Sequence, residues 1–241
     1  MTEMNMIASL NSALDNMLEV HDNVVIFGED LGYFGGVFRV TDGLQEKHGA
    51  HRVFDAPLAE GGIAAIAFGM GLNGLRPVAE IQFADYIFPA YDQIVNEIAK
   101  LRHRSGGEFS TPVTIRTPAG GGIKGGHHHS QSPESQFTHT PGLKVVYCSN
   151  PNNAKGLLTS AIECNDPVIF FEPKRCYRGP FYGDPHNVPT WKGHAKADVP
   201  EGHYSIPLEQ AEVVMEGDAC TVIAWGAMVH VAEQGIKDSG I

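Results

Sequence analysis

The sequence predicts an α/β domain in which a mostly parallel sheet is covered by helices on both faces. Two observations support this fold class. Apolar runs such as Val24–Phe27 lack the alternation of a half-exposed strand, as is typical of parallel strands buried on both faces. Segments with helical periodicity separate these runs, so that strands and helices alternate along the chain.

The first element is expected to be an amphipathic helix, because apolar residues recur at intervals of three and four: Ile7, Leu10, Leu14 and Met17. After Val24–Phe27, strands are expected at Arg52–Phe54, Pro77–Gln82, Val113–Arg116, Lys144–Cys148 and Val168–Phe171. Further helices are expected at Ile63–Met70, Ala90–Leu101 and Asn152–Glu163. Asn150 is a candidate cap of the last helix, with Pro151 at its first position.

The chain is expected to divide into residues 1–177, a connecting segment 178–207 and the beginning of a second α/β domain at 208–241. The connecting segment loses periodicity but contains aromatic side chains that would be costly to leave in water: Phe181, Tyr182 and Trp191. The last part is predicted to hold strands and a helix at Ala211–Met215, Thr221–Trp225 and Met228–Ile236. Two strands and one helix bury too little to form a core, so we expect this domain to be incomplete.

Composition excludes several classes of protein. The chain has 241 residues with 17 Lys and Arg against 28 Asp and Glu, a net charge of −11, which argues against a general nucleic-acid binder. No apolar run approaches the roughly 20 residues that cross a bilayer, and the N-terminal residues do not resemble a signal peptide. The four cysteines show no C-x-x-C spacing, so a reducing, cytosol-like compartment is expected.

Glu60 is the only charge in the apolar stretch 56–67 and is a candidate catalytic acid or base. The surrounding helix is expected to be buried nearly all round, so that loss of water would raise the pKa of this carboxyl and favour a group that holds a proton. The alternative is an ordinary acidic residue in a first helical turn, where the helix dipole favours it. The local pattern leaves both interpretations open.

A long glycine- and histidine-rich segment, residues 117–133, is predicted to be a binding loop or lid. A metal site at His127, His128 and His129 is disfavoured, because adjacent side chains rarely converge on one ion and no H-x-x-x-H pattern is present. Phosphate-binding glycine patterns are also absent. The loop therefore presents at least one imidazole for proton transfer, or is simply an exposed histidine tract.

Residues 81–90 contain three aromatic side chains between a predicted strand and a predicted helix: Phe83, Tyr86 and Phe88. Ligands bind beyond the carboxyl ends of parallel strands, so these rings are candidates for the wall of a flat ligand site. The alternative is that they belong to the core.

Several stretches together resemble the β chain of thiamine-diphosphate-dependent 2-oxo acid dehydrogenases, with the branched-chain type most similar. They are FGEDLGYFGGVF, FDAPLAEGGI, EIQFADYIFPAYDQIVNE, HSQSPE, PGLKVV, NAKGLL and DPVIFFEPKR, in order from about Val24 onward. The resemblance implies a transketolase-like pyrimidine-binding domain followed by a C-terminal domain. It also implies oxidative decarboxylation of a branched-chain 2-oxo acid and transfer of the acyl group to a lipoyl group of an acyltransferase.

The resemblance assigns site residues one by one. Glu60 matches the glutamate that bonds the aminopyrimidine ring of thiamine diphosphate and promotes its proton transfer, which favours the catalytic interpretation above. Leu58 and Tyr86 match residues that contact the thiamine rings, and His129 matches a histidine in the substrate pocket. Glu29 lies where the family places an acidic residue near the inter-subunit cofactor site.

The resemblance also implies further ions and partners. Branched-chain relatives suggest a possible potassium site at Thr111, Val113, Thr114 and the turn Ala161–Asp166, where Cys164 replaces the usual acidic residue. No G-D-G followed about thirty residues later by N-N occurs, so magnesium and the diphosphate are expected on an α subunit within an α2β2 heterotetramer. The expected location is the cytoplasm of a bacterium or, after processing, the mitochondrial matrix.

Three rival functions remain at this stage. A pyruvate or acetoin dehydrogenase β subunit would have the same chemistry and a different substrate preference. A non-catalytic assembly module would use its loop histidines to capture metal and would need no thiamine cofactor. A metal-dependent hydrolase would be active as an isolated chain and would lose its activity to a chelator.

Overall fold

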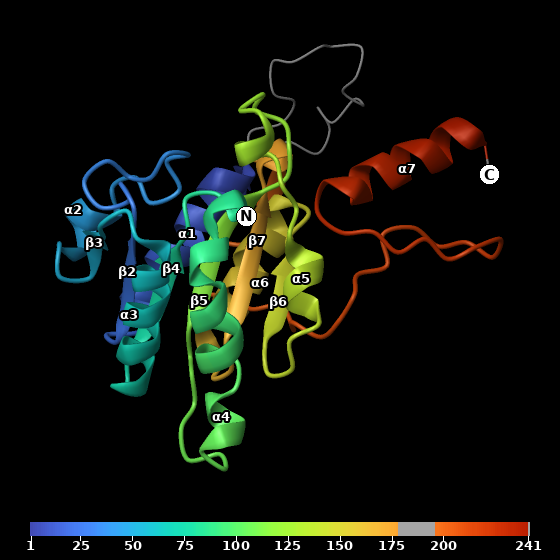
Figure 1. The fold of residues 1–241 in the computed structure, drawn as a ribbon. Helices are drawn as coiled ribbons and strands as arrows, with labels where there is room; N and C mark the ends of the chain where they lie inside the picture. The colour runs from blue at the N-terminus through green and yellow to red at the C-terminus, as the bar shows by residue number, and fades with distance from the viewer. Residues whose placement is uncertain (178–195, 241) are drawn as a thin grey trace.

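The computed structural model describes residues 1–177 and 196–240, and its centre is a sheet of six parallel strands in the order β3-β2-β4-β5-β7-β6 (Figure 1). The strands are β2 (Val24–Gly28), β3 (Val53–Asp55), β4 (Arg76–Glu80), β5 (Thr114–Ala119), β6 (Lys144–Tyr147) and β7 (Val168–Pro173). All residues of β2, β5 and β7 are buried, as expected for strands covered on both faces. The predicted fold class and all six predicted strands are confirmed.

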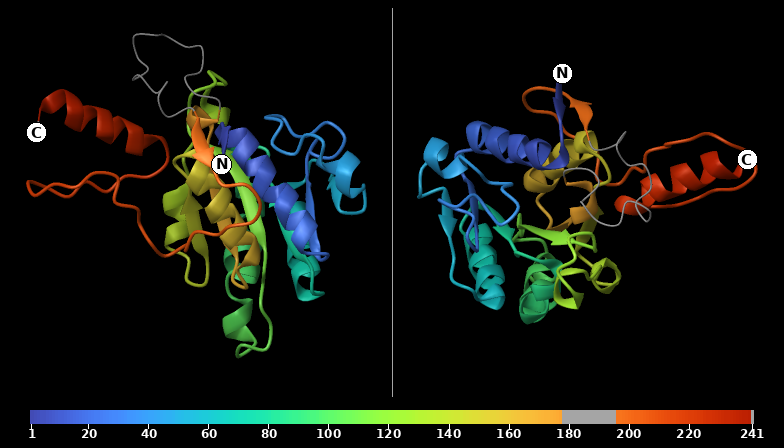
Figure 2. Two further views of the ribbon diagram at one scale, coloured as in Figure 1. Left: turned by 180° about the vertical axis from the view of Figure 1, so that it is seen from behind. Right: turned by 90° about the horizontal axis from the view of Figure 1, so that it is seen from above.

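Two layers of helices cover the sheet (Figure 2). One layer holds α1 (Met6–Val20) and α6 (Pro151–Glu163), which pack on each other, and the other holds α3 (Glu60–Leu72) and the π-helix η3 (Gln93–Ile98). Asn150 begins α6 with a reciprocal capping box, so the predicted cap is confirmed. The shorter helices are α2 (Leu44–His48), α4 (Leu101–Arg104), α5 (Glu134–Thr138), η1 (Ala84–Tyr86), η2 (Phe88–Ala90), η4 (His127–His129) and η5 (Lys174–Cys176). No described helix combines the length and apolar character needed to span a membrane.

The helix predicted at Ala90–Leu101 is interrupted. The turn η2 precedes it, the π-helix η3 forms its centre, and α4 begins only at Leu101. The π-type bond from the Ala99 backbone N–H to the Ile94 carbonyl measures 2.9 Å. Ile94, Val95 and Ile98 are buried, as the apolar pattern predicts, but that pattern does not reveal the π-type turn.

The expectation that α3 is buried nearly all round is wrong. One face of the helix, with Ile63, Ala64 and Ala67, is buried and packs toward β4. The opposite face is apolar yet exposed, and Ile66 keeps 47% of its surface accessible. The sequence shows that this helix is apolar on all sides. It does not show that the described part of the chain packs against only one of these sides.

The strands predicted at residues 211–215 and 221–225 are not formed in the described structure. Strands need hydrogen-bonding partners, and apolar side chains of this segment are exposed, with Val213 at 69% and Ile223 at 83%. The predicted helix is confirmed as α7 (Ala227–Ser239). A short antiparallel pair that the sequence did not indicate joins the N-terminus to the later segment: β1 (Thr2–Met4) and β8 (Ala197–Val199).

The aromatic residues Phe181, Tyr182 and Trp191 of the predicted connecting segment lie outside the described residues. The division of the chain into residues 1–177, 178–207 and 208–241 stays a prediction.

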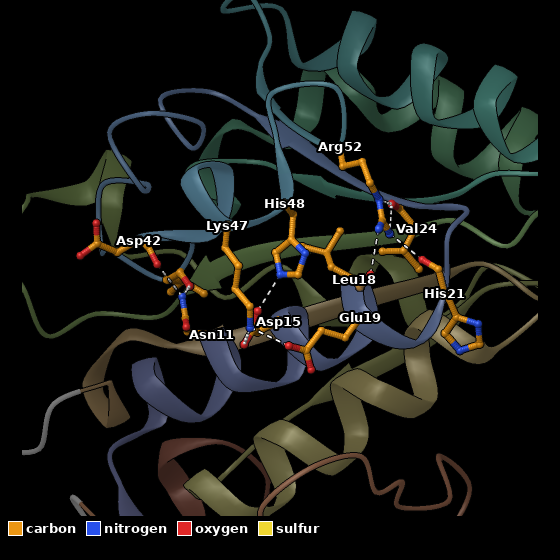
Figure 3. A network of polar contacts seen from close by, with 11 residues as sticks. Asn11, Asp15, Leu18, Glu19, His21, Val24, Asp42, Lys47, His48 and Arg52 are labelled. Carbon is orange, nitrogen blue, oxygen red and sulfur yellow. Dashed lines mark hydrogen bonds and ion pairs between the residues drawn. The ribbon is translucent and has the colours of Figure 1, made fainter.

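A polar network holds α2 and the loop after β2 against α1 (Figure 3). Asp15 of α1 accepts hydrogen bonds from Lys47 at 2.7 Å and pairs with His48 at 2.6 Å. Farther along, the guanidinium of Arg52 donates to the carbonyls of residues 18, 21 and 24. The side-chain amide of Asn11, in α1, donates to the carbonyls of Val40 and Asp42 in the loop after β2. These hydrogen bonds hold that loop against α1.

A fully buried arginine links three central strands. Arg116 of β5 contacts Glu172 of β7 through Nε at 2.7 Å and Nη2 at 3.0 Å, and Glu80 of β4 through Nη1 at 2.5 Å. The hydroxyl of Tyr177 donates to Glu172 at 2.6 Å. Burial raises the pKa of Glu172, and the arginine opposes this shift. The two carboxylates therefore depend on Arg116 as their counter-charge.

We expect Arg116→Met to lower the free energy of unfolding by about 3–5 kcal/mol, because it leaves two buried carboxylates without their counter-charge. Urea unfolding followed by circular dichroism measures this loss. Arg102→Met is the control, since Arg102 forms a half-exposed ion pair with Asp166 and its removal should cost about 1 kcal/mol or less. Equal losses in the two variants would contradict this role of Arg116.

Candidate active site

The carboxyl ends of four adjacent strands bring most of the predicted site residues to one edge of the sheet. Glu29 directly follows β2, Glu60 begins α3 after β3, Tyr86 lies in η1 after β4, and His129 lies in η4 after β5. Because these strands are parallel and adjacent, their carboxyl ends lie at the same edge. Parallel sheets bind ligands at this edge.

Two acidic residues form the first cluster. Glu29 is only 2% exposed, and neither of its carboxyl oxygens has a hydrogen-bond partner among the described residues. Burial raises the pKa of Glu29 to about 7, with further contributions from the negative charges of Glu60, Asp30 and Glu80. Glu60 is half-buried. The structure therefore places a carboxyl that exchanges a proton near neutrality within electrostatic reach of Glu60.

His129 belongs to the second cluster and is held as a single tautomer. Its Nδ1 lies 2.8 Å from the carbonyl oxygen of Gly125, and its Nε2 lies 2.8 Å from the hydroxyl of Tyr86. A carbonyl oxygen only accepts, so Nδ1 carries the hydrogen and the neutral ring accepts the Tyr86 hydroxyl at Nε2. The Phe83 ring meets the imidazole edge-on, with centroids 4.5 Å apart. Phe83 and Tyr86 thus contact the histidine as a wall.

The remaining candidates are placed differently. His127 and His128 pack against each other at 3.7 Å between ring centroids and are exposed, and no group of three metal-ligating side chains occurs among the described residues. Leu58 lies between β3 and α3 with 81% of its surface exposed. In this chain alone, Leu58 has an uncovered side chain beside the acidic cluster.

Two site residues were missed in the sequence. Asp85 accepts hydrogen bonds at Oδ1 from the backbone N–H groups of Ser130 and Gln131, at 3.2 and 3.1 Å. Lys174 is fully buried, its Nζ lies 5.3 Å from the centre of the Phe83 ring, and burial lowers its pKa to about 8. Asp85 is the only charge in the apolar stretch 81–91, which is the signal that would have identified it, whereas Lys174 lies among other charged residues and gives no such signal.

The predicted potassium residues lie at the opposite edge of the sheet, around the start of β5 and the end of α6. Their oxygens have protein partners already. The Val113 carbonyl accepts the N–H of Val168 at 2.9 Å, the Thr111 carbonyl accepts the N–H of Val113 at 2.7 Å, and the Thr114 hydroxyl donates to the Ala161 carbonyl at 3.1 Å.

Arginine side chains supply positive charge at the same turn. Nη1 of Arg76 donates to the carbonyls of residues 162–164 at 3.0–3.2 Å, including that of Cys164. Asp166 pairs with Arg102 at 2.7 Å. Two guanidinium groups lie at this turn, and their positive charge would oppose the binding of a further cation there. The potassium site stays a prediction.

Comparisons with known proteins agree on a family. The family model of the transketolase pyrimidine-binding domain matches residues 2–180. The 2-oxoisovalerate dehydrogenase subunit beta of Pseudomonas aeruginosa is 56% identical, over 100% of this chain and 69% of the relative. The mitochondrial 2-oxoisovalerate dehydrogenase subunit beta of Dictyostelium discoideum is 52% identical, over 98% and 60%. The pyruvate dehydrogenase E1 component subunit beta of Acholeplasma laidlawii is 47% identical, over 96% and 66%.

A solved structure agrees on the fold. The inactive β4 tetramer of a split-gene transketolase matches with a TM-score of 0.55 and 18% identity, over 70% of this chain and 50% of that chain. The chain spans between 60% and 69% of the length of the three relatives above. The predicted resemblance and fold are confirmed: the chain belongs to the transketolase-type pyrimidine-binding family and, within it, to the β subunits of branched-chain 2-oxo acid dehydrogenases.

Proposed function

We propose that the chain is one half of a thiamine-diphosphate-dependent enzyme that oxidatively decarboxylates branched-chain 2-oxo acids. The acyl group passes to a lipoyl group of an acyltransferase component, as a step of branched-chain amino acid degradation. The observation that carries this proposal is the acidic pair Glu29 and Glu60 at the ligand-binding edge of a domain that is 56% identical to a 2-oxoisovalerate dehydrogenase subunit. A pyruvate or acetoin dehydrogenase is the second candidate, supported by a pyruvate dehydrogenase relative at the lower identity of 47%.

The residues at this edge fit the pyrimidine side of thiamine diphosphate. A half-buried carboxyl such as that of Glu60 suits a ring nitrogen, and the exposed side chain of Leu58 offers an apolar contact. Tyr86 is the third residue that would hold the rings. When bound, the cofactor supplies the electron sink for loss of carbon dioxide from a 2-oxo acid.

The protein's own groups handle protons. With the cofactor bound, Glu60 would hold the ring nitrogen and could exchange a proton with it, while a proton on Glu29 would reduce the negative charge that surrounds Glu60. His129 presents Nε2 as its proton acceptor, because Gly125 fixes the hydrogen on Nδ1. Displacement of the Tyr86 hydroxyl by substrate would free this nitrogen for proton transfer.

Exposed apolar side chains near the site support an α partner. Tyr33 is 92% exposed, Phe34 54% and Leu58 81%, and the uncovered face of α3 adds Ile66. Exposed apolar patches mark protein interfaces. We propose that an α subunit covers them in an α2β2 heterotetramer and holds magnesium and the diphosphate. Bacterial and mitochondrial relatives fit a location in the cytoplasm or the mitochondrial matrix.

Glu60→Gln is expected to reduce thiamine-dependent turnover by about 100-fold or more in the assembly with an α subunit, because the amide cannot exchange the proton. Steady-state rates measure the loss, and gel filtration checks that the assembly is intact. Glu108→Gln changes an exposed carboxyl and is the control. Unchanged turnover in Glu60→Gln would favour a non-catalytic module, and chelator-sensitive activity of the isolated chain would favour a hydrolase.

The assembly is expected to prefer 3-methyl-2-oxobutanoate to pyruvate by at least about tenfold in kcat/KM, since each extra methylene in an apolar pocket contributes about 10- to 200-fold. Paired assays with the two acids at several concentrations measure this ratio. A clear preference for pyruvate would leave the fold and the acidic pair in place but would replace the branched-chain assignment with the second candidate.

Glu29 is expected to make the protein less stable as pH rises from about 4.5 to 7. Its pKa is about 7 in the folded chain and about 4.5 when exposed, so unfolding in this range releases a proton and becomes more favourable at higher pH. Urea unfolding of wild type and Glu29→Gln at several pH values tests this. The stability of wild type relative to the variant should fall across this range, and a constant difference would contradict the raised pKa.

A further inference from the structure

We propose that Asp85 is a positioning residue that fixes the loop of His129, so that the imidazole is presented in one place and one tautomer. This inference deepens the proposed function, because the catalytic role of His129 belongs to that proposal. Neither the sequence patterns nor the resemblance assigned a role to Asp85.

Asp85 holds the backbone of the histidine loop. It is 8% exposed, and its Oδ1 accepts the N–H groups of the two residues that directly follow His129, at 3.2 Å from Ser130 and 3.1 Å from Gln131. Hydrogen bonds from backbone N–H groups to a carboxylate are stronger than those between neutral groups. The carboxylate of Asp85, which follows β4, therefore fixes the backbone next to His129, which follows β5.

The same short turn also holds the imidazole. Tyr86, the next residue, donates its hydroxyl to Nε2 at 2.8 Å, and Phe83 packs edge-on against the ring at 4.5 Å between centroids. Residues 83–86 thus set the position and orientation of His129, and the Gly125 carbonyl fixes the tautomer while the ring is held beside it. Because η1 follows β4, the histidine is tied to the central part of the sheet although it lies on a long loop.

The charge of Asp85 is retained at an energetic cost. Its second oxygen, Oδ2, is buried without a hydrogen-bond partner among the described residues. The buried ammonium of Lys174 interacts with Asp85 electrostatically, yet its own hydrogen bond, to the Pro118 carbonyl, is long at 3.4 Å. The positive charge of Lys174 therefore offsets the negative charge of Asp85, while Oδ1 keeps its hydrogen bonds to the loop. A buried charge that lacks a direct pair is costly, which favours a functional reason for keeping it.

The loop has further contacts besides those to Asp85. The Gly120 N–H donates to the Gln131 carbonyl at 2.8 Å, and the Ser130 hydroxyl donates to the Gly126 carbonyl at 2.7 Å. Both contacts are made by the two residues whose N–H groups bond to Asp85. Loss of the carboxylate should consequently release the histidine within a loop that keeps its general path.

The test measures His129 directly in the assembled enzyme through the imidazole ¹⁵N resonances of histidine-labelled protein. Wild type should show the Nδ1–H tautomer. Asp85→Ala should show a mixture of the two tautomers, and Asp85→Asn, whose amide oxygen still accepts N–H groups, should restore most of the wild-type signal. Asp55→Ala is the matched control, because Asp55 also accepts a loop N–H at this edge, from Gly32 at 2.7 Å.

Turnover provides the second measurement. Asp85→Ala should lower kcat by about 10- to 100-fold with little change in KM, since a displacement of about 1 Å costs up to this much. A wild-type tautomer signal and kcat in Asp85→Ala would overturn the proposal. If Asp85→Ala does not fold, Asp85→Asn decides alone, because its neutral oxygen makes weaker bonds than the carboxylate. A small fraction of the second tautomer with a proportionate fall in kcat would support positioning, and a fully wild-type signal, with or without loss of activity, would overturn it.

A failure of the catalytic role proposed for His129 has a different signature. If His129 has no such role, His129→Ala will keep full turnover, whatever the tautomer signal of the Asp85 variants. Loss of turnover in His129→Ala together with an unaffected Asp85→Ala would overturn the role of Asp85 and leave the proposed function intact.

Discussion

The buried ion pairs of Arg116 are the constraint on which the rest of the structure depends. They connect β4, β5 and β7, and the carboxyl ends of these three strands lead to η1, to the histidine loop and to Lys174. A relative shift of one strand would break charge-assisted bonds in the interior, where water cannot replace them. The sheet therefore offers rigid attachment points for loops that are themselves irregular. The positions of η1 and the histidine loop therefore depend on this network, because both segments directly follow the strands that it connects.

Negative charge is distributed unevenly at the ligand-binding edge. Glu80 and Glu172 share the guanidinium of Arg116, whereas Glu29 has no cationic partner among the described residues and its pKa is raised. Burial therefore has different consequences for similar side chains. Glu80 and Glu172 are ionised partners of an arginine, whereas Glu29 holds its proton up to about neutral pH. Asp85 is a third case, a buried carboxylate bonded to backbone N–H groups and balanced at a distance by Lys174.

The fold was predictable from the sequence because β2 and the first four residues of β7 are continuous apolar runs, and segments with helical periodicity separate the strands. Glu60 and His129 were located through the resemblance, and local pattern alone left their roles open. Asp85 was not predicted, because its partners follow His129 more than forty residues later in the sequence. The errors at α3 and at residues 211–225 share one cause. Apolar side chains show that a segment favours burial, but they do not show which chain buries it.

We propose that this chain forms half of a cofactor site, and that another subunit covers its exposed Leu58 and the outer face of α3. Calorimetric titration of thiamine diphosphate with magnesium into the chain, into an α partner and into the mixture tests this claim most directly. We expect saturable binding with a stoichiometry of about one per αβ pair in the mixture, and binding at least about 100-fold weaker to this chain alone, because the diphosphate contacts would be missing. Equally tight binding to the isolated chain would contradict it.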